Sequence, residues 1–324
     1  MSGWQTMAGA VLAIFGIVGI GAAARRVNWL TAEADETLLK LVIRVLLPAL
    51  ILRVVIGNPR LVHAQNLVLP PLVGFGTLLL GFLVGALVAR WAHRPLGLNT
   101  PAHRRTFALC VGIYNYGYVP LPLAEQFFGT GTVGVLFVHN IGVEVALWTV
   151  GILLLSGGLD RRWWLRLINA PSMAIMAALA INFLHWDGYL PQFVMDSLDL
   201  LGRCAIPVGL LLIGATIADH FKESQLHRAG AVMAAACVLR LGLLPAAFLG
   251  LAWLLPVSTE LQRVMVLQAA MPSAVFPIIL ARHYRGDAPT AVRIVIGTSL
   301  VSLITMPIWI WAGLHLLGMS DAAL

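Results

Sequence analysis

Charged residues are scarce in this chain of 324 residues: they make up 11% of it, whereas hydrophobic residues make up 60% and the mean hydropathy is +0.89. Soluble globular domains contain about 25% charged residues. The composition therefore excludes a soluble globular domain and predicts an all-α polytopic membrane protein, whose partner is the lipid bilayer. The net charge of +7 is explained by basic loops on one membrane side, so we expect no nucleic-acid partner.

Cysteine is also rare. Cys110, Cys204 and Cys237 lie in apolar segments without a paired spacing, which gives no support to a disulfide framework or a metal site. No HExxH, GxSxG or Walker motif is present, so neither a membrane-embedded hydrolase nor ATP-driven transport has support. We therefore expect no enzymatic activity, no catalytic residue, no metal and no cofactor.

Ten apolar segments are candidates for crossing the membrane, since a crossing needs about 20 mostly apolar residues. The sixth is short. They cover residues 7–24, 38–56, 67–89, 106–127, 131–156, 171–186, 198–218, 230–255, 261–281 and 288–316.

Lysine and arginine are distributed unequally between alternate connections. One side holds Arg60 and Arg263, and the other holds thirteen residues: Arg25, Arg26, Arg90, Arg94, Arg104, Arg105, Arg161, Arg162, Arg166, Lys222, Arg228, Arg282 and Arg285. Because basic loops stay in the cytoplasm, this bias predicts that both termini are non-cytoplasmic.

A basic aromatic connector, residues 157–170, divides the segments into two sets of five. We expect it at the cytoplasmic interface, between a first five-helix repeat (1–156) and a second one (171–324). Since each set holds an odd number of segments, two repeats would have opposite orientations in the membrane, as inverted repeats do.

Two of the segments are interrupted. The stretch NYGYVPLPL, residues 115–123, places Gly117, Pro120 and Pro122 inside the fourth segment, and AMPSAVFPII, residues 270–279, places Pro272 and Pro277 inside the ninth. Proline and glycine break helices. The backbone N–H and C=O groups that a break leaves unpaired are tolerated in a membrane only where they are buried in protein or line a cavity. Matching breaks in two halves are typical of a transporter's binding site, although prolines can also merely kink a helix.

Broken helices suit an anion, because a half-helix N-terminus presents free amides and a positive dipole end. Asn115 precedes the first break and can either hold a substrate or cap a half-helix. Ser273 and Gln268 at the second break have the same two interpretations.

Asn140 and Glu144 are four residues apart in the fifth segment, hence on one helix face. An ionisable residue at that depth is a functional candidate. Glu144 can carry a coupling proton, or its charge can be paired with that of Arg240 in the eighth segment; Arg240 can alternatively attract an anionic substrate.

The two interrupted stretches also carry a resemblance. Asn115 with the following YGYVPLPL, the stretch AMPSAVFPIILARHY (270–284) and the early RVLLPALI (44–51) are similar to motifs of the auxin efflux carrier family, whose plant branch comprises the PIN auxin exporters. On these motifs the chain resembles a bacterial member of that family, which places it in the inner (plasma) membrane.

The resemblance implies two inverted five-helix repeats whose broken fourth and ninth helices cross. By position, Asn115, Pro120, Pro122, Pro272 and Pro277 would form the crossing. It further implies a secondary transporter that moves a small organic anion, a carboxylate such as malonate, malate or an auxin-like acid, by alternating access. Pro120 stands where the family usually has glycine, and the third segment lacks an acidic and basic pair associated with the plant carriers.

Three points stay open from the sequence. The protein could be a ligand-binding membrane receptor or an assembly subunit without transport. A proton or a sodium ion could be coupled to transport, and the chain could form a homodimer.

Overall fold

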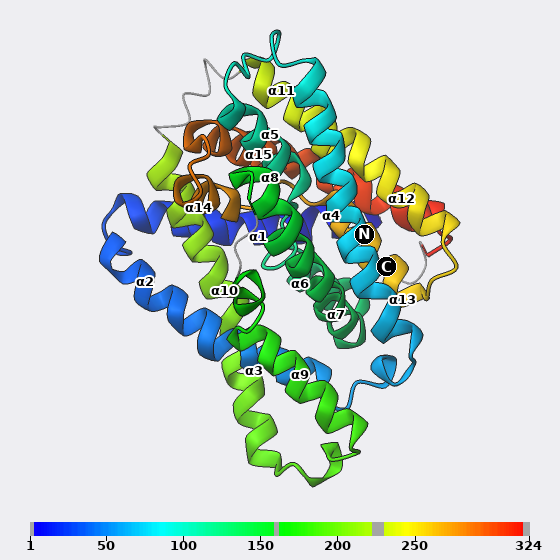
Figure 1. Ribbon diagram of the computed structural model, residues 1–324. Helices are drawn as coiled ribbons and strands as arrows, with labels where there is room; N and C mark the ends of the chain where they lie inside the picture. Colours follow the sequence, from blue (N-terminus) through cyan, green and yellow to red (C-terminus); the bar gives the residue numbers. More distant parts are fainter. Residues whose placement is uncertain (1–2, 159–161, 222–229, 320–324) are drawn as a thin grey trace.

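The computed structural model describes residues 3–158, 162–221 and 230–319, and in these residues the regular structure is helical (Figure 1). Three short π-helical segments, η1, η3 and η7, continue the α-helices on either side of them. The α-helices are α1 (Gly3–Arg26), α2 (Ala32–Leu41), α3 (Leu47–Val55), α4 (Gln65–Trp91), α5 (Pro101–Gly112), α6 (Pro120–Phe128), α7 (Thr130–Ala146), α8 (Ile152–Ser156), α9 (Ala170–Phe183), α10 (Gln192–Phe221), α11 (Gly230–Val238), α12 (Leu244–Leu254), α13 (Thr259–Ala270), α14 (Phe276–His283) and α15 (Ala288–Leu316).

Within the described residues, six helical runs are long and apolar enough to cross a membrane: Trp4–Arg26, Gln65–Trp91, Thr130–Ser156, Gln192–Phe221, Gly230–Leu254 and Ala288–Leu316. The chain is thus a multi-pass membrane protein. Four other predicted segments fail this simple test for physical reasons. The fourth and ninth are broken into half-helices, and the second carries Lys40, Arg44 and Arg53. The sixth, α9, has 14 residues, about 21 Å of helix.

The π-helical segments explain how two prolines are accommodated inside long helices. Segment η1 (Val42–Leu46) ends two residues before Pro48, and η7 (Leu239–Leu243) ends two residues before Pro245. A proline ring collides with the carbonyl four residues earlier. The wider π turn moves that carbonyl away, so the helix continues past the proline.

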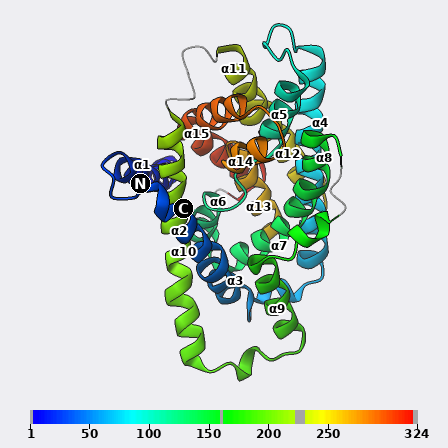
Figure 2. The same cartoon turned by 60° about the vertical axis from the view of Figure 1, so that its left-hand side comes forward.

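The helices form two groups. We call α1, α2, α3, α9 and α10 the side layer, because α10 packs along both α1 and α3 and α3 packs on α9. We call α4 to α8 and α11 to α15 the main bundle, in which α4 packs on α7 and α5, and α15 on α11 and α13. Figure 2 shows α1 and α10 along one edge of the molecule and α4 along the opposite edge. The groups meet where α1 contacts α15 and α3 contacts α7.

The connector predicted from the sequence, residues 157–170, lies partly within the residues that the structure describes. Segment Trp163–Arg166 is a short 3-10 helix, and the Asn169 side chain accepts a hydrogen bond from the Ser172 N–H at the start of α9. The Arg166 guanidinium lies over the rings of Trp148 and Tyr284, which ties this connector to the main bundle. Of the basic residues used to predict orientation, Arg161, Lys222 and Arg228 lie outside the described residues.

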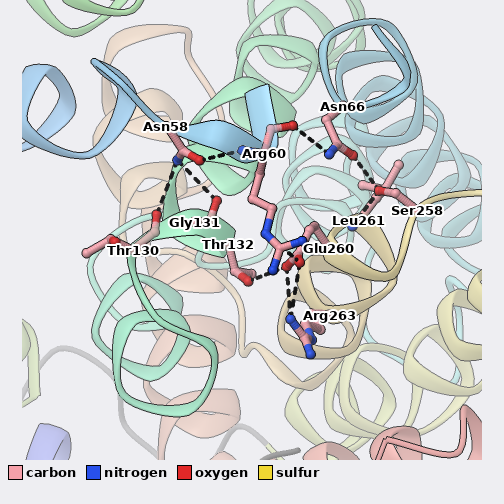
Figure 3. Close-up of polar contacts among 10 residues, drawn as sticks. All are labelled: Asn58, Arg60, Asn66, Thr130, Gly131, Thr132, Ser258, Glu260, Leu261 and Arg263. Carbon is pink, nitrogen blue, oxygen red and sulfur yellow. Dashed lines mark hydrogen bonds and ion pairs between the residues drawn. The ribbon is translucent and has the colours of Figure 1, made fainter. Parts of the chain in front are cut away.

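A polar cluster joins the α3–α4 connection to the main bundle (Figure 3). Glu260, in the first turn of α13, accepts a hydrogen bond of 2.7 Å from the Thr132 hydroxyl and pairs with Arg60 and Arg263 at 3.2 and 3.1 Å. The carboxylate is buried, so its charge needs these partners. The cluster therefore holds three chain segments together at one end of the bundle.

Close packing of α4 on α7 depends on glycine. A Cβ atom at Gly142 would overlap the carbonyl oxygen of Pro71, and one at Gly74 would overlap that of His139. Small residues at such positions let helix backbones approach each other in membranes. These two contacts set the position of α7, which carries Asn140 and Glu144.

We expect Gly142→Ala to destabilise the protein by about 1–3 kcal/mol, because the added methyl group must separate α4 from α7. The measurement is the melting temperature of the purified protein in detergent. Gly76→Ala is the matched control, since a Cβ there meets open space. Equal melting temperatures for the two variants would contradict the close approach.

Candidate functional site

The two helix breaks lie against each other. Tyr114 and Ser273 form an antiparallel β-bridge. The Asn115 N–H donates to the Pro272 carbonyl at 2.8 Å, and the Ala274 N–H donates to the Ile113 carbonyl at 3.0 Å. The interruptions between α5 and α6 and between α13 and α14 thus satisfy each other's backbone groups.

At both breaks a proline lies at the start of the helix that follows the break. Pro120 is the first residue of α6, and Pro277 is the second residue of α14. Proline suits these positions, because its fixed φ matches the helix and the first N–H groups of a helix have no partner within it. Pro122 follows in the first turn of α6, and Pro272 lies in the second break, where its carbonyl accepts the Asn115 bond.

The first break exposes hydrogen-bond donors. Within the described parts of the chain, the N–H groups of residues 116–119 donate to no partner, and the Asn115 side-chain amide has none either. Tyr116, Gly117 and Tyr118 are partly exposed, and a Cβ at Gly117 would meet open space. These donors precede the positive N-terminal end of α6, so the donors and the helix end together can bind an anion.

Asn140 holds the break in place. Its Nδ2 donates to the Tyr116 carbonyl at 2.8 Å, and Gln268 Nε2 lies 3.4 Å from both that carbonyl and Asn140 Oδ1. Helices α7 and α13 therefore hold Tyr116 from two sides. The Asn140 donor is used within the protein, which favours a positioning role for this residue.

Ser273 has a capping role in this structure. Its hydroxyl donates to the Cys110 carbonyl at 2.8 Å, and its N–H donates to Thr298 Oγ1 at 3.3 Å. The residue is 1% exposed. It satisfies the last turn of α5 and does not face the open side of the break.

Glu144 receives two hydrogen bonds of 2.7 Å, one from the Tyr116 hydroxyl and one from Trp148 Nε1. Because Tyr116 is part of the first break, the carboxylate is connected directly to the candidate site. Asn140 and Glu144, on one face of α7, thus hold the backbone and the side chain of the same tyrosine.

The ion pair between Glu144 and Arg240, one of the two sequence-based alternatives, is not formed. Arg240 is fully buried, its Nη2 donates to the Ala269 carbonyl at 3.2 Å, and its guanidinium lies over the rings of Tyr114 and Phe248. The arginine thus serves the C-terminal end of α13, where a cation is favoured. The Glu144 carboxylate is hydrogen-bonded instead by Tyr116 and Trp148.

Sequence reasoning missed the tyrosines of the first break. The ring of Tyr118 lies so close to Gly209 of α10 that a Cβ there would overlap it, so this side chain contacts the side layer. Tyr116 connects Asn140, Gln268 and Glu144. The signal was available, since both tyrosines flank Gly117 within the interrupted stretch. Among the described residues, no group of three His, Cys, Asp or Glu residues could hold a metal ion.

Asn140→Ala is expected to lower the melting temperature, because the Tyr116 carbonyl loses its shortest hydrogen bond at a net cost of about 1 kcal/mol. Asn115→Ala removes a side chain without a partner among the described residues and is expected to leave the melting temperature nearly unchanged. Thermal unfolding of both purified variants without added substrate tests this. A larger loss for Asn115→Ala would contradict the assignment of a free amide.

Known proteins resemble this chain over most of its length. A family model described as membrane transport protein matches residues 6–162 and 159–310. An uncharacterized transporter of Methanothermobacter thermautotrophicus is 27% identical over 92% of this chain and 96% of its own length. An uncharacterized transporter of Methanocaldococcus jannaschii is 21% identical over 61% of this chain and 64% of its own length. Auxin efflux carrier component 7 of Arabidopsis thaliana is 25% identical over 47% of this chain and 25% of the plant protein. With the family model matched across both halves, the chain belongs to the membrane transport protein family, the family of the auxin efflux carriers.

Proposed function

We propose that the protein is a secondary transporter of small organic anions and binds a carboxylate where the two broken helices cross. The observation that carries the proposal is the run of free N–H groups at residues 116–119, next to the free amide of Asn115. Backbone donors at a half-helix N-terminus bind an anion without a cationic side chain.

Charge and polarity around the crossing support an anion over a cation. Helices α6 and α14 both begin at a break, so the positive ends of their dipoles lie at the two breaks. At the opposite ends, the C-termini of α5 and α13, the Cys110 carbonyl accepts a hydrogen bond from Ser273 and the Ala269 carbonyl accepts one from Arg240. The buried Arg240 guanidinium at the end of α13 also disfavours a cation there.

Alternating access is supported by the division into side layer and main bundle. The pairing of helices is reciprocal: α1 packs on α10 as α9 packs on α3, and α4 packs on α7 as α11 packs on α15. Two inverted repeats, 1–156 and 171–324, would produce this pattern. In our proposal the bundle carries the crossing past the layer, with both termini non-cytoplasmic in a bacterial inner membrane.

One ionic contact would open and close in such a movement. Arg53 of α3 pairs with Glu125 of α6 at 2.9 Å and with Asp199 of α10 at 2.6 Å. Glu125 is close to the first break on the same half-helix. The contact thus stabilises the present arrangement of the two groups, and a partly buried pair of this kind breaks at modest cost.

The substrate class follows from the donors. Several N–H groups and one amide suit the two oxygens of a carboxylate, and Tyr116 and Tyr118 supply apolar surface beside them. Malonate, malate and an auxin-like acid are candidates of this class. The plant relative, an auxin efflux carrier component, is compatible with this substrate class.

Asn115→Ala is expected to abolish carboxylate exchange while leaving the fold intact. The experiment is counterflow of labelled malonate, malate and indole-3-acetate in liposomes containing the purified full chain. Asn99→Ala is the matched control, since Asn99 is exposed in a connection far along the chain from either break. Unchanged exchange in Asn115→Ala would move the site away from the crossing. Ligand-dependent stabilisation of the wild type with no flux of any probe would instead indicate a receptor.

Glu144 is our candidate for proton coupling. Moving one negative charge outward is favoured by about 2.3 kcal/mol per 100 mV, so efflux needs no coupled ion, whereas uptake against the potential does. Tyr116 connects the Glu144 carboxylate to the substrate donors. A proton on Glu144 would weaken the Trp148 hydrogen bond, because the indole N–H only donates.

Glu144→Gln is expected to remove the pH dependence of uptake while retaining exchange, since a glutamine keeps the shape without titrating. Uptake driven by an imposed pH gradient, compared with counterflow at equal pH, separates the two effects. Glu33→Gln, which changes an exposed carboxylate at the start of α2, is the control. Identical pH profiles for wild type and Glu144→Gln would remove Glu144 from the coupling mechanism.

A further inference from the structure

Three arginines converge on a groove at one end of the main bundle. Arg90 is in the last turn of α4, and Arg104 and Arg105 are in the first turns of α5. The groove encloses about 290 Å³, and its apolar floor includes Ala89, Ala108 and Leu154. Helices α4, α5 and α8 supply the lining and lie side by side in Figure 1.

These three guanidinium groups have no counter-charge within residues 3–158, 162–221 and 230–319. None of them makes a hydrogen bond or ion pair with any residue that the structure describes, and Arg104 Nε is shielded from solvent without a partner. By contrast, Arg25 is paired with Asp35, and Arg53 with Glu125. Three neighbouring cations repel each other, and an anion between them would relieve that repulsion.

The backbone adds to the positive potential. Pro101 lines the groove as the first residue of α5, and the Thr100 side chain accepts only the His103 N–H. Pro101, Arg104, Arg105 and Ala108 share one face of this 12-residue helix, so the groove runs along its first turns, close to the positive N-terminal end. Phosphate groups bind at such ends, and arginine forms bidentate hydrogen bonds with them.

Apolar side chains border the groove on the outside of the bundle. Leu83 and Leu87 of α4 and Leu153 of α8 are exposed, and Trp91, one residue beyond Arg90, is 80% exposed. In a chain that spans the membrane, exposed leucines face lipid tails, and a tryptophan at a helix end is typical of the headgroup level. The arginines therefore lie where the headgroups of the bilayer begin.

We propose that this groove binds the phosphate headgroup of an anionic glycerophospholipid, with Arg90, Arg104 and Arg105 as ligands and the acyl chains along Leu83 and Leu87. A free phosphate shares the headgroup chemistry, but the adjoining apolar face favours the lipid. The bound lipid would hold the start of α5, the half-helix that ends at the crossing, against the membrane surface. This site is separate from the carboxylate site and does not depend on it.

The test is a titration of the purified full chain in neutral detergent with phosphatidylglycerol, followed by thermal unfolding. Phosphatidylcholine and inorganic phosphate are titrated in parallel. We expect saturable stabilisation by phosphatidylglycerol alone. In Arg104→Gln/Arg105→Gln the half-saturating concentration should rise on the order of 25-fold, since one arginine near an anionic surface contributes about fivefold.

Arg94→Gln is the matched control, because Arg94 is exposed in the adjacent connection but does not line the groove. It should respond as the wild type does. If the double variant does not fold, Arg90→Gln and Arg105→Gln are tested singly, each with about a fivefold increase expected. Equal phosphatidylglycerol responses in the wild type and the groove variants would overturn the proposal. Stabilisation by inorganic phosphate in the same concentration range would overturn the assignment to a lipid.

Discussion

The two backbone hydrogen bonds between the helix breaks, from Asn115 to Pro272 and from Ala274 to Ile113, are the interaction on which the rest of the structure depends. An unpaired backbone polar group in hydrocarbon costs several kcal/mol, so neither interrupted helix is stable in a membrane by itself. Each break supplies what the other lacks. The first and second halves of the chain are therefore coupled at the candidate site.

The carbonyl groups and the N–H groups of the breaks differ in the hydrogen-bond partners that the protein supplies. Carbonyl groups at the C-terminal ends of α5 and α13 receive donors from the protein, Ser273 for Cys110 and Arg240 for Ala269. The N–H groups before α6 receive none from the described residues. Open N–H groups before a helix favour a hydrogen-bond acceptor, and most of all a negatively charged one, because the helix dipole and charge-assisted hydrogen bonds add to its binding.

The sequence was sufficient for an all-helical membrane protein and for the positions of the two breaks, because both depend on local chemistry. Apolar length and proline position locate the interruptions within a few residues. The pairing of Glu144 was not predictable in this way. Depth alone suggested Arg240 as a partner, whereas the contact with Tyr116 depends on how α7 is rotated, which Gly142 and Pro71 set through a contact between helices. The capping of Cys110 by Ser273 joins residues 163 positions apart, and no local pattern encodes it.

The same reasoning explains the α3–α4 connection, where the chain passes from the side layer to the main bundle. Asn182 of α9 holds the end of α3, donating to the Val55 carbonyl at 2.7 Å and accepting from the Gly57 N–H at 2.8 Å. The next residue, Asn58, donates to the Gly131 carbonyl at the start of α7 (Figure 3).

Gly57 is thus hydrogen-bonded to the side layer, and its neighbour Asn58 is hydrogen-bonded to the main bundle. Gly57 has the positive φ of +65° that glycine adopts without strain. At this connection a relative movement of the two groups would act on Gly57 and Asn58, since the chain on either side is held by hydrogen bonds. Glu260 and its arginines add to the hold on the bundle side. The α3–α4 connection, one of three connections between the two groups, is therefore short and held at both ends, so little of it is left to bend if the groups move relative to each other.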